Sequence, residues 1–225
     1  MKKITVKDFF SKQFEEESNK VLIGSPEFFS PELMFDYVHQ IIEHGLSEFI
    51  SYAQKIQLPE ITSKDITQLS SIDDCAINMC EMLKNNGNTG LAFQEIATNL
   101  HRSELYKFND TALNKYGENQ VKTACQLGLT ILQENKWYLT AIGYIYPQLS
   151  KEEQNKLLSV VLLRDPFYNR VLCSLVNEDT SIRDFMSLLS ETTIKRRIPS
   201  CTKLIEFFVH QCDSEGVKTY RLITT

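Results

Sequence analysis

Apolar side chains recur at helical spacing over most of the chain, and the pattern is clearest in the N-terminal part. Between Leu33 and Ala53 they return every three or four residues, which predicts one long helix ending near Lys55. Ser30 followed by Pro31 is typical of a helix start, because serine caps the first turn and proline fits the first helical position. We therefore expect a helical N-terminal region, with polar, loop-like residues before this helix.

Residues 60–72 interrupt the helical spacing and predict a linker. Pro59, Ser63 and the pair Ser70-Ser71 are residue types that punctuate regular structure. A chain of 225 residues has room for one large domain or for two to three small ones. We expect three parts, which cover residues 1–70, 71–148 and 149–225.

The middle part predicts three helices followed by a β-hairpin. The predicted helices cover residues 72–83, 91–100 and 110–129. The last one is expected to be interrupted at Tyr116-Gly117. Short apolar runs around Ile131 and Trp137 flank a polar turn, as in a β-hairpin. Three helices and a hairpin, in that order, are typical of a winged helix, an elaborated helix-turn-helix.

The C-terminal part predicts the same order with a weaker wing. Ser150 and Glu153 form a capping box that opens a helix ending at Leu163. Further helices are predicted over residues 167–176, 181–189 and 192–211, and a closing strand over 217–223. Pro199 is expected to break the last helix. The predicted fold class is mainly α: tandem winged-helix units with short β-hairpin wings, preceded by a helical N-terminal region.

Composition narrows the functional classes. Hydrophobic residues make up 42% and charged residues 24%, as in an ordinary globular protein. The net charge of −5 argues against a general polyanion binder, so any contact with nucleic acid must come from local patches. No apolar run reaches the roughly 18 residues that span a bilayer, and the first residues lack the apolar stretch of a secretory signal. We expect a cytoplasmic protein without a membrane partner.

The six cysteines and four histidines are dispersed, without metal-ligand spacing. Phosphate-binding, dinucleotide-binding and hydrolase motifs are missing from the sequence. Glu134-Asn135-Lys136 has the short acid-to-lysine spacing of a restriction nuclease, but it lies in the predicted turn. We expect no cofactor and no metal. Whether the chain is an enzyme stays open; the sequence favours a non-catalytic chain whose partner carries any nuclease activity.

Candidate DNA-binding residues follow from the predicted winged helices. In such folds the last helix enters the major groove, where Asn and Gln can bond adenine and Lys can neutralise phosphate. The candidates in the middle part are Lys115, Tyr116, Asn119, Gln120, Lys122 and Lys136, the last near the tip of the wing. The alternative is that these residues form an ordinary solvated face.

The C-terminal part holds a compact basic segment. Residues 192–203 contain four basic side chains and no acidic one, together with short hydroxyl side chains that suit phosphate. The candidates are Thr193, Lys195, Arg196, Arg197, Ser200 and Lys203. The alternatives are a solvated basic face or a partner for the acidic N-terminal region.

Two of these stretches resemble a known family. Residues 116–124 (YGENQVKTA), followed by Leu127-Gly128-Leu129, and residues 193–200 (TIKRRIPS) are similar to the motifs of a winged-helix family found in or beside bacterial restriction endonucleases and phage-defence genes. Gln120 stands where His is common in that family, and Ser200 stands where Thr is common. Residues 203–204 replace a frequent Trp. The resemblance covers about residues 72–225.

The resemblance implies DNA binding. We therefore expect a duplex DNA-binding protein, the sequence-recognition module of a restriction-modification or phage-defence system. Its expected partners are double-stranded DNA and a nuclease or other defence-system subunit, and residues 1–70 could form a homodimer. The alternative is a non-catalytic protein-interaction scaffold, which the negative net charge favours. In that case the N-terminal helix and Trp137 would be contact surfaces.

Overall fold

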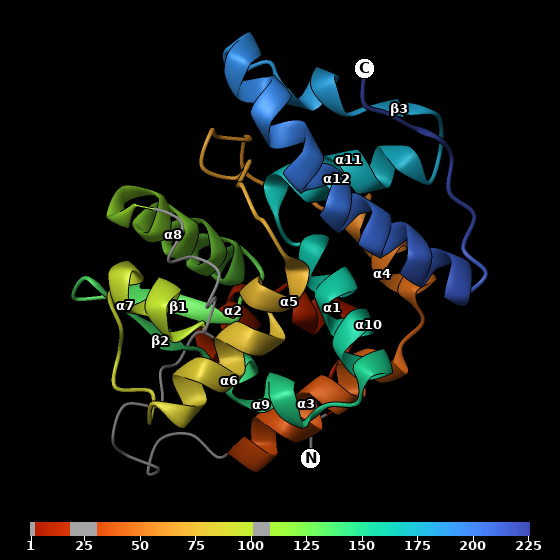
Figure 1. The fold of residues 1–225 in the computed structure, drawn as a ribbon. Helices are drawn as coiled ribbons and strands as arrows, with labels where there is room; N and C mark the ends of the chain where they lie inside the picture. The colour runs from red at the N-terminus through yellow and green to blue at the C-terminus, as the bar shows by residue number, and fades with distance from the viewer. Residues whose placement is uncertain (1–2, 19–30, 101–108) are drawn as a thin grey trace. The chain divides into compact units, whose positions relative to one another are not determined.

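The computed structural model describes residues 3–18, 31–100 and 109–225. Helices dominate, and the strands form two small two-stranded sheets (Figure 1). Contacts divide the chain into two compact units. Of the helices in the described ranges, none is both long and apolar enough to cross a lipid bilayer.

Both units are discontinuous in sequence. The terminal unit comprises Met1–Phe10, His39–Gln68 and Lys151–Thr225, and the central unit comprises Ser11–Val38 and Leu69–Ser150. The expected N-terminal region of residues 1–70 is therefore shared between the two. Its apolar stripe is already buried within the chain, as the full burial of Val38 and Phe49 illustrates.

The central unit contains the predicted hairpin. Its elements are α2 (Lys12–Ser18), the first part of α3 (Pro31–Glu43), α5 (Ile72–Cys75), α6 (Ile77–Asn85), α7 (Phe93–Asn99), α8 (Asp110–Gln126), β1 (Thr130–Gln133), β2 (Lys136–Leu139), α9 (Ala141–Ile145) and the 3-10 helix η2 (Tyr146–Gln148). The strands β1 and β2 are antiparallel. Glu134 and Asn135 both adopt positive φ between them, as a two-residue hairpin turn requires.

A single residue before α7 extends this hairpin. Leu91 and Trp137 exchange two backbone hydrogen bonds, with N···O distances of 3.1 and 2.9 Å, in an isolated antiparallel bridge. The order along the central unit is thus helix α6, bridge residue, helices α7 and α8, then the hairpin.

Helix α8 runs without interruption, so the break expected at Tyr116-Gly117 is wrong. The helix begins at Asp110, where the Asn109 side chain accepts a hydrogen bond from the backbone N–H of Ala112 at 2.9 Å. Helix α8 packs on α7 (Figure 1), and Gly117 lies at this contact, close to Phe93 and Ala97. A Cβ atom added there would lie 2.2 Å from the backbone oxygen of Phe93. The glycine therefore permits close packing and does not end the helix.

The terminal unit lacks a second hairpin. Its elements are α1 (Val6–Phe9), the end of α3, α4 (Leu46–Ala53), α10 (Lys151–Leu162), α11 (Pro166–Leu175), β3 (Thr180–Ser181), the 3-10 helix η3 (Ile182–Met186), α12 (Glu191–Ser214) and β4 (Leu222–Ile223). The two short strands are parallel. Within residues 151–225, all of which the structure describes, no antiparallel hairpin follows α12. The expected second wing is therefore wrong, and most of the helix expected over 181–189 is a 3-10 turn.

Two helix breaks also differ from expectation. The predicted helix over residues 33–55 is divided at Gly45, where the backbone is extended. The carboxylate of Glu215 accepts a hydrogen bond from the N–H of the next residue, Leu46, at 2.7 Å.

Helix α12, in contrast, continues through Pro199, where a break was expected. Pro199 has no N–H to donate a hydrogen bond to the carbonyl of Lys195. Lys195 and Pro199 are both exposed, so water can hydrate that carbonyl. The proposed cap Ser30 lies outside the described residues.

Candidate nucleic-acid interface

The outer face of α8 carries two lysines with one carboxylate between them. Lys115 Nζ lies 2.8 Å from Glu118 Oε2, and Lys122 Nζ lies 2.5 Å from Glu118 Oε1. These hydrogen bonds from Lys115 and Lys122 lower the pKa of the Glu118 carboxyl. The two candidate lysines of α8 are therefore already paired within that helix.

Gln120 is buried and does not face solvent. Its side chain is 0% exposed. The amide Nε2 donates to the hydroxyl of Tyr116 at 3.0 Å, and Oε1 accepts from the backbone N–H of Ser70 at 3.4 Å. The Tyr116 hydroxyl in turn donates to the buried carboxylate of Asp74. Gln120 therefore cannot contact a base edge, and the prediction of a DNA-reading role for it is wrong.

The remaining candidates of the central unit occupy mixed positions. Asn119 is half-buried on α8, whereas Lys136 is exposed beside the hairpin turn, opposite Gln133. Trp137 is buried, so the indole is not available as a contact surface for a partner protein. Of the residues predicted in this unit, Lys115, Lys122 and Lys136 are the exposed cations.

Helix α12 presents a separate group of exposed cations. Positions three or four apart share one face of a helix. Five neighbouring exposed residues of α12 with this spacing form what we call the basic stripe: Thr192, Lys195, Arg196, Pro199 and Lys203. The exposed acids Glu191 and Glu206 continue the same face before and after it. The stripe extends about 16 Å along the axis, because each residue adds about 1.5 Å.

The carboxylate at the start of α12, that of Glu191, is held mainly by Arg183. Glu191 receives two hydrogen bonds from Arg183 Nη2, at 2.5 and 2.7 Å, while Lys195 Nζ is 4.0 Å from it. Within the described part of the chain, Arg196 is in no ion pair. Arg196 is therefore an exposed cation of the stripe whose charge is not neutralised by a described carboxylate.

Three predicted residues of this helix lie off the stripe. Ser200 is buried, and Thr193 is half-buried with its hydroxyl 2.9 Å from that of Ser190. Arg197 is half-buried, with its Nε atom enclosed, and burial lowers the pKa of the guanidinium. Of the two adjacent arginines, Arg196 is thus the one that can reach a ligand in solvent.

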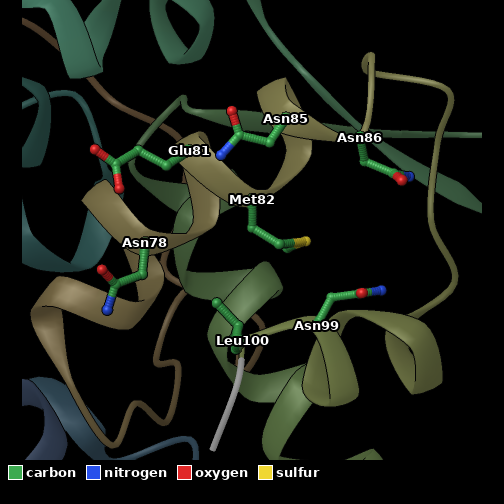
Figure 2. A pocket seen from close by; sticks show the side chains of 7 residues that line it. All are labelled: Asn78, Glu81, Met82, Asn85, Asn86, Asn99 and Leu100. Atoms are coloured by element: carbon green, nitrogen blue, oxygen red, sulfur yellow. The ribbon is translucent and has the colours of Figure 1, made fainter.

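A polar cavity that the sequence did not indicate lies beside α6 and α7. It encloses about 450 Å³ and is lined by Asn78, Glu81, Met82, Asn85, Asn86, Asn99 and Leu100 (Figure 2). Several amide nitrogens are already engaged: Asn78 donates to Asp74 at 2.7 Å, and Asn99 donates to the carbonyl of Glu95 at 2.9 Å. Of the described residues that line it, Glu81 is the charged one.

The cysteines and histidines do not assemble a site in the residues that the structure describes. No group of three or more His, Cys, Asp or Glu side chains in these ranges is arranged to hold a metal ion. Burial raises the pKa of the Cys75 and Cys201 thiols to about 12, which keeps both protonated at neutral pH.

Comparisons of the chain with protein-family models, with curated proteins and with solved structures found no match. Among the candidate residues inferred from the sequence, Glu118 was missing, although it pairs with two of them. Its spacing of three and four residues from the two lysines on one helix was the available signal.

Proposed function

We propose that this chain binds duplex DNA and that the basic stripe of α12 supplies the phosphate contacts. The observation that carries the proposal is the alignment of Lys195, Arg196 and Lys203 on one exposed face. The carboxylate of Glu191, 4.0 Å from Lys195 Nζ, is hydrogen-bonded to Arg183. A row of exposed cations at this spacing attracts a polyanion even when the protein is acidic overall.

Lys195 and Arg196 lie in the second turn of α12, and Lys203 lies about two turns further along the same face. The logarithm of the binding constant falls linearly with the logarithm of the salt concentration, and we call this gradient the salt slope. Neutralising three phosphates would give a salt slope of about −2.7, because each contact contributes about −0.9 on duplex DNA. Binding of this kind is therefore strong only at low salt unless base contacts add to it.

The element order of the central unit supports a second part of the proposal. A helix, a one-residue bridge, two helices and a hairpin follow one another from α6 to β2, which is the order expected of a winged helix. We infer that residues 71–148 form a winged helix with α8 as the recognition helix. In the terminal unit, α11, η3 and α12 keep the three-helix order but close with a parallel strand instead of a wing.

The motif resemblance supports a narrower role. Residues 116–129 and 193–200 are similar to motifs of a family associated with restriction endonucleases and phage defence. On that basis we propose that the chain is the sequence-recognition module of such a system, and that a nuclease or another defence subunit is its partner.

Binding of labelled random duplex DNA, measured by fluorescence anisotropy at about 50 and 200 mM salt, tests the proposal. Arg196→Ala should weaken binding severalfold at the lower salt and reduce the salt slope by about 1. Lys64→Ala is the matched control, because Lys64 is an exposed cation in a loop of the same unit. Equal affinities for wild type and Arg196→Ala would remove α12 from the interface. Failure of wild type to bind at either salt would reject DNA binding.

A protein-interaction scaffold is the second candidate. Two observations favour it: Leu132 is 49% exposed on the hairpin, and the Glu118 carboxylate is paired with both lysines of α8. An exposed apolar side chain on a hairpin suits contact with another protein better than contact with phosphate. Absence of salt-sensitive DNA binding by the wild-type protein would favour this role.

A further inference from the structure

Glu118 separates the two lysines of α8 in a symmetrical arrangement. Each carboxylate oxygen holds one ammonium group, at 2.8 Å for Lys115 and 2.5 Å for Lys122. The lysine side chains are 59% and 54% exposed, whereas that of Glu118 is 24% exposed. The carboxylate is thus the more enclosed member, and the two lysines flank it on the solvent-facing side of the helix.

This arrangement changes what α8 offers to a nucleic acid. Two lysines alone would attract phosphates of any sequence, but the carboxylate cancels one of the two charges and repels phosphate. Exposed ion pairs are weak and are screened by salt, so the lysines can exchange Glu118 for phosphates. Where a bound duplex excludes water from α8, the carboxylate then needs a new hydrogen-bond donor, because a desolvated charge without a partner is costly.

We propose that Glu118 is a specificity-determining residue that accepts a hydrogen bond from the amino group of a cytosine in the major groove. This inference rests on the proposed DNA binding and on α8 being the recognition helix. Cytosine presents an amino donor in that groove, and glutamate is a suitable acceptor for it. At a site with cytosine in the right position, Glu118 gains a donor while Lys115 and Lys122 bind phosphates. On other sequences it keeps the lysines paired and weakens binding.

The substitution Glu118→Gln tests two expected effects of the carboxylate: weaker binding to DNA in general and preference for a site with cytosine. It keeps the size of the side chain and removes the charge, so affinity for a random duplex pool should rise severalfold and the salt slope should steepen by about 0.9. Preference for a duplex selected with the wild-type protein, relative to the pool, should fall by about tenfold. Replacing the C·G pair at the critical position by T·A should lower the affinity of the wild-type protein for the duplex. The affinity of Glu118→Gln should stay nearly unchanged.

The matched control is Glu81→Gln, an exposed glutamate on α6 of the same unit. If both variants raise affinity for the pool equally, the effect is one of net charge, and the role of Glu118 is rejected. The role of Glu118 is also rejected if Glu118→Gln changes neither the affinity for the pool nor the sequence preference. In that case salt-sensitive DNA binding by the wild-type protein would still support the proposed function. If wild type binds no duplex, both the function and this inference fail.

Discussion

The side-chain amide of Gln120 donates a hydrogen bond to the hydroxyl of Tyr116, one turn earlier on α8, at 3.0 Å. The hydroxyl in turn donates to Asp74, whose other carboxylate oxygen accepts from Asn78 at 2.7 Å. Gln120 also accepts from the backbone of Ser70. This buried network fixes α8 against residues 70–78, so it determines which face of the helix remains exposed.

Tyr116→Phe should therefore destabilise the protein by about 1–3 kcal/mol, because it leaves the Asp74 carboxylate and the Gln120 amide each without one partner. Urea denaturation followed by circular dichroism measures the loss. Tyr220→Phe is the control: Tyr220 is exposed, and its hydroxyl accepts only a surface hydrogen bond from Lys218. A similar loss in both variants would contradict the importance of the buried network.

Gly117→Ala should destabilise the protein by about 1–3 kcal/mol, because the new methyl group would push α8 away from α7. If Gly117 instead marked a flexible break, alanine would be the better helix former and would stabilise the protein. Thermal unfolding distinguishes these outcomes. Gly45→Ala is the matched control, since a Cβ atom there meets nothing closer than the Ser47 hydroxyl at 3.6 Å.

Glu215→Ala should cost about 1–2 kcal/mol of unfolding free energy. The carboxylate of Glu215 caps α4 through the N–H of Leu46 and lies 3.4 Å from Lys156 Nζ. Glu215→Gln keeps an acceptor oxygen for the cap and loses only the charge, so it should retain much of the stability. Chemical denaturation compares the two variants with wild type, and an equal loss in both would assign the effect to the ion pair instead of the cap.

The ion pairs of Glu118 should make a small contribution to stability that depends on pH. Hydrogen bonds from Lys115 and Lys122 lower the pKa of this carboxyl in the folded protein. A lowered folded pKa contributes stability above the ordinary glutamate value of about 4.3, and this stability is lost as pH falls through the folded pKa. Glu118→Gln should thus be less stable than wild type at pH 7, by under about 1 kcal/mol.

At about pH 3 that difference should shrink as the carboxyl becomes protonated. Urea unfolding of both proteins at the two pH values measures it. A difference that stays constant with pH would mean that Glu118 stabilises the helix by something other than its charge.

The sequence by itself determined the features that depend on nearby residues. The hairpin follows from two short apolar runs around Glu134 and Asn135, because this turn is closed locally and Asn tolerates positive φ. Helix α10 follows from its apolar spacing and the Ser150 start. The exposed face shared by Lys195, Arg196 and Lys203 follows from the helical repeat alone.

Only the tertiary structure decided the features that depend on distant residues. Gln120 resembles a surface residue in the sequence, but Ser70 and Tyr116 satisfy its amide inside the central unit. Gly117 resembles a helix break, but contact with α7 requires a residue without a Cβ atom. Residues 1–70 look like a separate region, yet they supply core side chains to both units. The local pattern fixes which segments are helical, whereas burial depends on partners far along the chain, which periodicity does not specify.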